Sequence, residues 1–153
     1  MATTLQKIDL ARPAVAATEA GAAQLSDTYW EEVGRLTGGL IRRRDTVRGS
    51  ELRLAGVTLF RFAEAVTTVT PELVESRFAI LGGLLAKEEA GALTFAQRSA
   101  PRFELEVSVT DYVPRLSSRR ERRSLRHFIY RQVQERLHTI VGRRYLARMA
   151  GAR

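Results

Sequence analysis

The clearest pattern in the chain is the run Phe103-Glu104-Leu105-Glu106-Val107-Ser108-Val109-Thr110, in which apolar and polar side chains alternate four times in succession. Because successive side chains of a strand point to opposite faces of its sheet, this period of two predicts a strand with one buried and one polar face. Glu104 and Glu106 then share the polar face. Paired carboxylates can serve as an acid–base pair, but a solvated face is the commoner arrangement, and we expect it here.

The segments before this strand carry weaker versions of the same pattern. Two of them are separated by a loop over residues 88–91 and predict a hairpin. The residues that share one face of this hairpin are Val74, Ser76, Phe78 and Ile80, followed by Leu93, Phe95 and Gln97. Further upstream the apolar positions change parity at Ala55-Gly56, which predicts one long strand interrupted by a bulge.

Helices are expected on either side of the strands. Ser26 precedes two early acids and predicts a helix N-cap, and Gly38-Gly39 predicts its end. After Pro114, a helix over Ser118–Met149 is predicted from apolar residues at steps of three and four. Those residues are Leu125, Phe128, Ile129, Val133, Leu137, Ile140 and Val141.

The first 25 residues allow two interpretations. They form either a flexible leader rich in Ala and Thr, or a strand over Thr3–Leu10 followed by a short helix from Pro13. Residues 26–153 are expected to form a single α+β domain. Its core would be an antiparallel sheet packed on the C-terminal helix, with one or two helices near the N-terminus.

The net charge of +8 is confined to one part of the chain. Residues 115–153 contain 12 Arg and two acids (net +10), whereas residues 1–114 contain 13 basic and 15 acidic residues (net −2). The basic runs are Arg42-Arg43-Arg44 and a second run of Arg119, Arg120, Arg122 and Arg123. Such runs can neutralise the phosphates of nucleic acid or lipid. A solvated basic face is the alternative, because Arg replaces almost all Lys in this chain, 23 against 2.

Several kinds of chemistry lack support in the sequence. The chain has no Cys, which excludes disulfides and thiolate sites, and no apolar run long enough to span a membrane. Its two His, His127 and His138, are eleven residues apart, which is not the spacing of a helical metal pair. Nucleotide-binding and nucleophile-elbow motifs are also missing. We therefore expect no metal and no cofactor.

Candidate acids and bases remain scattered. The groups considered for proton transfer are Tyr29, Glu75, Asp111 and Tyr112. Arg126 and Arg136 fall within the apolar arc of the last predicted helix. Their guanidinium groups either approach the interior, where they would need a ligand oxygen, or extend past the edge of the core into solvent.

The order of these elements resembles the START-like, or SRPBCC, helix-grip superfamily. A short first strand, helices ending at Thr37, antiparallel strands from Leu40 to Val113 and a closing helix carry the resemblance. It implies a curved antiparallel sheet of five to seven strands that wraps the long C-terminal helix, with an apolar cavity between them. Family members with this cavity bind lipids or polyketides, and some are aromatase/cyclases. The residues that would then line the cavity or the core are Phe60, Phe62, Phe78, Phe95, Phe128 and Leu137. Because the resemblance includes no motif, it assigns no catalytic residue.

Two hypotheses follow from the sequence. In the first, a cytoplasmic protein holds a hydrophobic small molecule between sheet and last helix, as a binding protein or as a cyclase-type enzyme. Tyr112, Arg126 and Arg136 are then the candidate catalytic residues. In the second, Arg119, Arg120, Arg122 and Arg123 dock an acidic protein, nucleic acid or an anionic membrane. The apolar stripe of the last helix also allows a homodimer.

Overall fold

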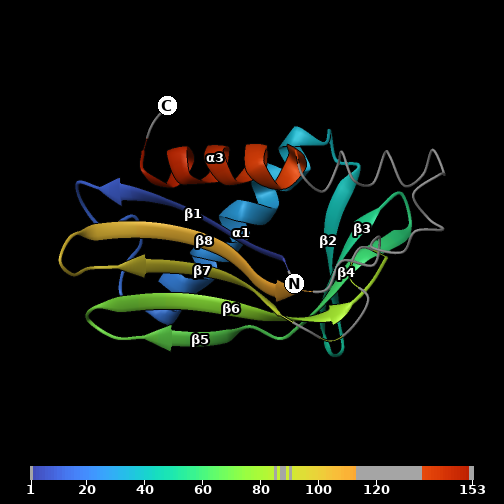
Figure 1. Cartoon of the computed structure of the whole chain (residues 1–153), viewed down its shortest axis with the longest axis horizontal. Helices are drawn as coiled ribbons and strands as arrows, with labels where there is room; N and C mark the ends of the chain where they lie inside the picture. The colour runs from blue at the N-terminus through green and yellow to red at the C-terminus, as the bar shows by residue number, and fades with distance from the viewer. Residues whose placement is uncertain (1, 85, 87–88, 90, 113–135, 152–153) are drawn as a thin grey trace.

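The computed structural model describes residues 2–84, 86, 89, 91–112 and 136–151, which form an α+β fold. Figure 1 shows their arrangement. In chain order the elements are β1 (Ala2–Leu10), α1 (Glu19–Leu36), β2 (Ile41–Thr46), β3 (Gly49–Leu54), β4 (Val57–Ala63), β5 (Val66–Val69), β6 (Leu73–Gly82), β7 (Ala92–Arg98), β8 (Phe103–Tyr112) and α3 (His138–Met149).

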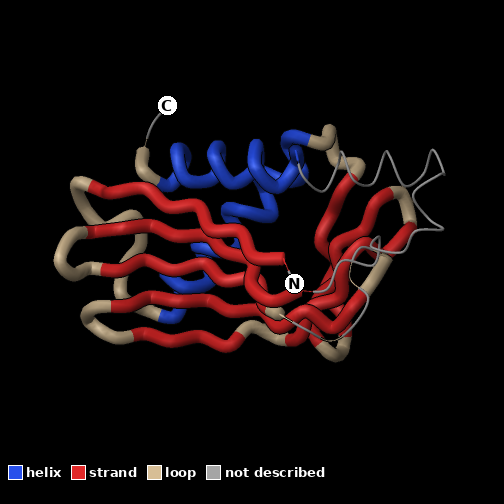
Figure 2. The backbone as a smooth tube through the Cα atoms, in the orientation of Figure 1, coloured by secondary structure: helices blue, strands red, loops and turns tan. Residues whose placement is uncertain are grey.

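The strands form one open antiparallel sheet in the order β1-β8-β7-β6-β4-β3-β2, with β5 paired to β6. The long strand β6 joins two halves of this sheet. Its residues 73–79 pair with β7, whereas Ile80 and Gly82 pair with β4. Figure 2 shows β2, β3 and β4 turned steeply against the stack of β1, β8, β7, β6 and β5. The sheet is therefore strongly curved.

The strand number exceeds the five to seven expected, because the described residues form eight. One reason is the segment around Ala55-Gly56, where a bulge was predicted. Leu54 pairs with Val57, and Ala55 and Gly56 have φ of 46° and 87°, so they form a two-residue hairpin turn between β3 and β4. The prediction of one bulged strand is wrong, since a tight turn changes the parity of the apolar positions just as a bulge does.

The N-terminal segment also departs in part from its predictions. The strand expected over Thr3–Leu10 is β1, which pairs with β8 along its length. The helix expected from Pro13 is absent from the described residues, because α1 begins at Glu19, where the Thr18 side chain accepts a hydrogen bond from the backbone N–H of Gly21. Ser26 is therefore not a cap. It is buried inside α1, and its hydroxyl donates to the Ala23 carbonyl.

Both helices pack on the same face of the sheet. Tyr29 of α1 and Tyr145 of α3 each contact the ring of Phe95, which is fully buried on β7. On the opposite face, Glu104 and Glu106 lie 3.2 and 3.8 Å from cationic nitrogens of Lys7 and Arg98. The polar face of β8 is confirmed, although its two carboxylates are paired with bases rather than simply solvated.

The C-terminal helix α3 covers 12 residues and packs on α1, β1 and β8. It forms the last part of the helix predicted over Ser118–Met149, and residues 113–135 lie outside the described part of the chain. Neither α1 nor α3 is apolar and long enough to cross a bilayer.

Candidate functional site

The interior beneath α1 holds an aromatic cluster, which we define as Trp30, Phe60, Phe62, Phe78 and Phe95. The Trp30 ring centroid lies 5.7 Å from that of Phe62, 6.2 Å from that of Phe78 and 6.3 Å from that of Phe95. Phe60 stacks on Phe62 at 5.9 Å and is only half-buried. The structure thus brings together four of the six residues predicted to line a cavity or core, and adds Trp30 to them.

The other two residues of that prediction lie elsewhere. Leu137, which precedes α3, is half-buried and packs against the core. Phe128 lies outside the described residues. The sequence does contain a signal for Trp30, because Leu25, Tyr29 and Val33, which are buried on α1, flank it at helical spacing. The sequence-based prediction missed it because it assigned no apolar face to this helix.

Three polar atoms in this interior are buried and make no hydrogen bond within the described structure. They are Nε1 of Trp30, Oγ of Ser50 and the hydroxyl of Tyr145. Ser50 is 2 % exposed, and its Cα pairs across the β3–β4 ladder with that of Phe62, a member of the aromatic cluster. Leaving a buried donor without a hydrogen bond costs about 1–3 kcal/mol of stability. A ligand oxygen that accepted a hydrogen bond from such an atom would remove this cost.

A second group of polar side chains joins the start of α3 to α1 and β1. The imidazole of His138 has Nδ1 3.2 Å from the Tyr29 hydroxyl and Nε2 2.8 Å from Oγ1 of Thr4. In a neutral imidazole one nitrogen donates and the other accepts, so both contacts are satisfied together. We call these three residues the Tyr–His cluster. Tyr29 was among the predicted proton-transfer groups, whereas His138 was considered only as a metal ligand.

Burial governs the acid–base behaviour of this region. Desolvation lowers the pKa of His138 and raises the pKa of Tyr29. The pKa of Tyr145 is raised by burial first and by the neighbouring Tyr29 second. The imidazole and both phenols are therefore neutral at pH 7. In this state they can donate and accept hydrogen bonds, but none of them provides a fixed charge.

Replacing His138 with Asn should remove a loss of stability at acidic pH. Because the pKa of His138 is lowered on folding, the unfolded chain binds its proton more tightly. His138 therefore lowers stability as the pH falls from about 6.5 towards the folded-state pKa, and adds no further loss below it. Thermal unfolding of both proteins across this range checks the prediction. Parallel curves for the wild type and the variant would contradict it.

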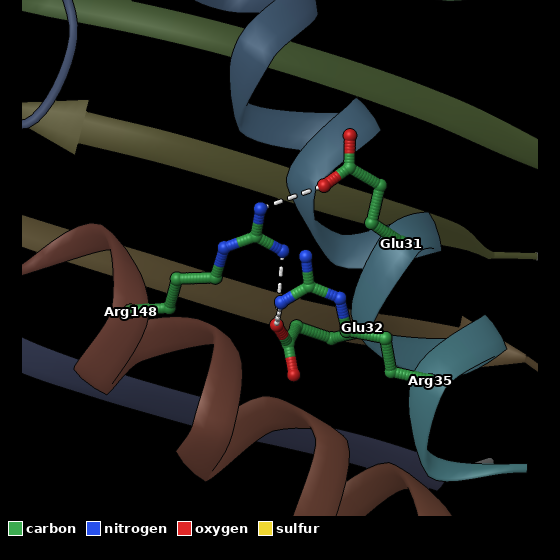
Figure 3. Close-up of polar contacts among 4 residues, drawn as sticks. All are labelled: Glu31, Glu32, Arg35 and Arg148. Carbon is green, nitrogen blue, oxygen red and sulfur yellow. Dashed lines mark hydrogen bonds and ion pairs between the residues drawn. The ribbon is translucent and has the colours of Figure 1, made fainter. Parts of the chain in front are cut away.

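An ion-pair network holds α3 against α1 and so positions both clusters (Figure 3). The guanidinium of Arg148 lies 2.7 Å from a Glu31 oxygen and 2.9 Å from a Glu32 oxygen. Arg35 approaches the same Glu32 oxygen as Arg148, at 3.7 Å. Since Glu32 is 6 % exposed, removing these cations would leave an uncompensated buried carboxylate, which costs more than breaking a surface ion pair. Its effect is to fix Tyr145 and His138 relative to Tyr29.

The structure places the remaining predicted site residues as follows. Arg136 is exposed, and Tyr112 is the last residue of β8, with its backbone opposite Ala2. Arg126 and the basic run Arg119, Arg120, Arg122 and Arg123 lie outside the described residues. Within the described part of the chain, no three carboxylates or imidazoles gather in a way that could hold a metal ion.

Comparison of the chain with protein-family models, with curated proteins and with solved structures finds no match.

Proposed function

We propose that the protein binds a hydrophobic small molecule between its curved sheet and its helices, with the aromatic cluster as the wall of the site. The observation that carries this proposal is a pair of buried donors, Trp30 Nε1 and Ser50 Oγ, which have no hydrogen-bond partner among the described residues and lie in a region lined by aromatic rings. Apolar walls with a few convergent polar groups are typical of small-molecule sites. The preferred ligand would be an apolar, ring-containing molecule with a carbonyl or hydroxyl oxygen that accepts from these donors.

Two further features support this proposal. Besides Trp30 and Phe60, three apolar residues near the β2–β4 part of the sheet, Leu52, Leu54 and Leu84, are only half-buried. They offer apolar surface that a ligand could cover, at a gain of about 25 cal/mol per Å². The order of strands and helices is also compatible with the helix-grip superfamily that the sequence resembles.

A cyclase-type reaction is the enzymatic form of the proposal, and the Tyr–His cluster is the group best suited to it. Tyr29 contacts Trp30 with ring centroids 5.4 Å apart, so a proton donor adjoins the aromatic wall. His138 is neutral and can relay a proton to or from the Tyr29 hydroxyl. The cytoplasmic location, the homodimer and the docking role of the basic helix remain predictions from the sequence.

The single tryptophan gives a direct test, because a ¹⁵N-labelled sample has one indole N–H cross-peak, that of Trp30. Titration with 1-tetralone and with tetralin, which differ by one carbonyl, separates hydrogen bonding from apolar contact. We expect 1-tetralone to move the cross-peak downfield and tetralin to perturb it without this shift. Native mass spectrometry of the purified protein should in addition show a co-purified apolar molecule. An indole cross-peak unmoved by either probe, in a protein that carries no such molecule, would overturn the proposal.

Replacing Ser50 with Ala should raise the stability of the protein and at the same time reduce its preference for a ligand with a carbonyl group. The variant loses a buried hydroxyl that has no partner within the described structure, so its free energy of unfolding should rise by about 1 kcal/mol. Its preference for 1-tetralone over tetralin should fall roughly three- to tenfold, because one donor to the carbonyl is gone.

Ser26→Ala is the matched control, since this buried hydroxyl already donates to the Ala23 carbonyl. It should leave the preference for 1-tetralone unchanged and give no gain in stability. Urea unfolding and the two titrations measure both quantities. A destabilised Ser50→Ala variant with an intact preference would show that Ser50 serves packing alone.

A further inference from the structure

A groove of about 390 Å³ lies where the loop between α1 and β2 meets the turn between β3 and β4. Four arginines, Arg42, Arg43, Arg44 and Arg53, line it together with glycines of the two flanking turns, Gly39 and Gly56. Arg42 and Arg53 are paired across the β2–β3 ladder, so their side chains leave the same face of the sheet. Ile41 and Leu54, the next pair along, point to the other face and pack with the core.

The two paired arginines are held in place by neutral groups. Nε of Arg42 donates to the Gly39 carbonyl at 2.7 Å, and Nη2 of Arg53 donates to the Gly56 carbonyl at 2.6 Å. The Arg42 guanidinium lies so close over Gly39 that a Cβ there would be 2.9 Å from its Nη2. Because carbonyls orient these cations without neutralising them, both keep their full charge and their remaining N–H groups.

The charges around the groove do not balance. Arg43 is compensated, since its guanidinium contacts Asp27 at 3.3 Å and Asp45 at 3.1 Å. Arg42, Arg44 and Arg53 make no ion pair with the described residues. The nearest acid by strand register is Glu51, which lies opposite Arg44 on one side and Arg61 on the other.

Like charges directly opposite each other destabilise a sheet, yet Arg42 and Arg53 are opposite. In addition, Nε of Arg53 is buried and has no hydrogen-bond partner within the described structure. A bound anion would resolve both problems. It would reduce the repulsion between the two guanidinium groups and accept a hydrogen bond from Nε of Arg53.

We propose that this groove binds the phosphate group of a small phosphorylated molecule. Guanidinium groups bind phosphate oxygens in pairs, and two arginines with fixed side chains present several donors on one side of the groove. A dianion matches the facing pair of cations, Arg42 and Arg53, better than a single carboxylate does. The concave volume between two tight turns suits a small molecule. Arg42 and Arg53 leave the face of β2 and β3 opposite the aromatic cluster, whereas Arg43 is on the cluster's side, with its guanidinium carbon 5.9 Å from the Trp30 ring centroid. The proposed site rests on Arg42 and Arg53, so it goes beyond the function proposed above and can fail independently of it.

Calorimetric titration with pyrophosphate and with inorganic phosphate tests this site. At low salt we expect one pyrophosphate per chain, bound more tightly than inorganic phosphate, with an affinity that weakens as chloride is added. Arg42→Glu should lower the pyrophosphate affinity by roughly tenfold or more, because it replaces a ligand by a repelling charge.

The fold of this variant should persist, since Glu opposite Arg53 converts a repulsive pair into an attractive one, and its Tm should match or exceed that of the wild type. Arg77→Glu is the charge-matched control, because Arg77 is exposed on the part of β6 that pairs with β7, away from β2 and β3. It should change the affinity less than about twofold.

Three results would overturn the proposal. The first is no pyrophosphate binding by the wild type at low salt, and the second is an equal loss of pyrophosphate affinity in the Arg42→Glu and Arg77→Glu variants. The third is binding of RNA or anionic lipid vesicles that depends on Arg42 while pyrophosphate does not bind. The last result would assign the surface to a macromolecule.

Discussion

Replacing Phe95 with Ala is expected to lower the free energy of unfolding by about 3–5 kcal/mol, the range for a large aromatic side chain lost from a core. Phe95 is 0 % exposed, and its ring contacts those of Tyr29, Trp30 and Tyr145 at 5.0, 6.3 and 5.7 Å between centroids. It is therefore the residue at which α1, α3 and the sheet meet. Urea unfolding followed by far-UV circular dichroism measures the loss.

Phe60→Ala is the matched control, because Phe60 belongs to the same aromatic cluster but is only half-buried at its edge. Its removal should cost only about 1–2 kcal/mol, since less apolar area is lost and the space opens to solvent. It should nevertheless weaken the binding of 1-tetralone. A Phe60→Ala loss as large as that of Phe95→Ala would contradict this division between core and binding surface.

The strands that the sequence predicted well are those with a half-buried face. In β6 the burial alternates as the apolar positions do, with Phe78 inside and Arg77 outside. In β8 Leu105 and Val107 are buried and Glu104 and Glu106 half-buried, although Ser108 on the polar face is buried as well. The β3–β4 turn was missed because neither Ala55 nor Gly56 is part of an Asn-Gly or Asp-Gly pair, the usual signal of such a turn. The strand β5 was missed because its four residues are mostly exposed and lack alternation.

The helix start shows how tertiary packing can override a local signal. Ser26 has the residue type of a cap, but on one face of α1 the side chains of Ala22, Leu25 and Tyr29 are all buried in the core. Because this apolar stripe begins before Ser26, packing lengthens the helix back to Thr18. The sequence of residues 19–25 is rich in small side chains, which gives little indication of such burial.

The candidate site was only partly predictable for a related reason. Inward-facing phenylalanines follow from strand alternation, so Phe62, Phe78 and Phe95 could be named in advance. The contacts of His138 with Tyr29 and Thr4 join residues more than 100 positions apart. No local sequence pattern predicts contacts between residues so far apart in the chain. The same holds for Ser50: that its hydroxyl has no hydrogen-bond partner within the described structure follows only from the positions of its neighbours.

Replacing Gly49 with Ala is expected to lower the free energy of unfolding by about 3–5 kcal/mol, because two costs combine at this residue. Gly49 begins β3 with φ of 147°, a conformation that side chains rarely adopt. A Cβ there would also overlap the carbonyl oxygen of Phe62 and lie 2.8 Å from the carbonyl carbon of Ala63. Both atoms belong to the backbone of β4, which pairs with Gly49, so neither can move without breaking the β3–β4 ladder.

The strain should reach the proposed ligand site, because Ser50 follows Gly49 and Phe62 lies opposite Ser50. We therefore expect Gly49→Ala to abolish the response of the Trp30 indole cross-peak to 1-tetralone, even in the fraction that remains folded. Gly34→Ala is the control: a Cβ on this helical glycine would meet no atom of another element within 4 Å, and the replacement should stabilise the protein by about 0.5–1 kcal/mol. Equal stabilities of the two variants would show that β3 can shift freely against β4. The curvature that brings Ser50 to the aromatic cluster would then not be fixed by this ladder.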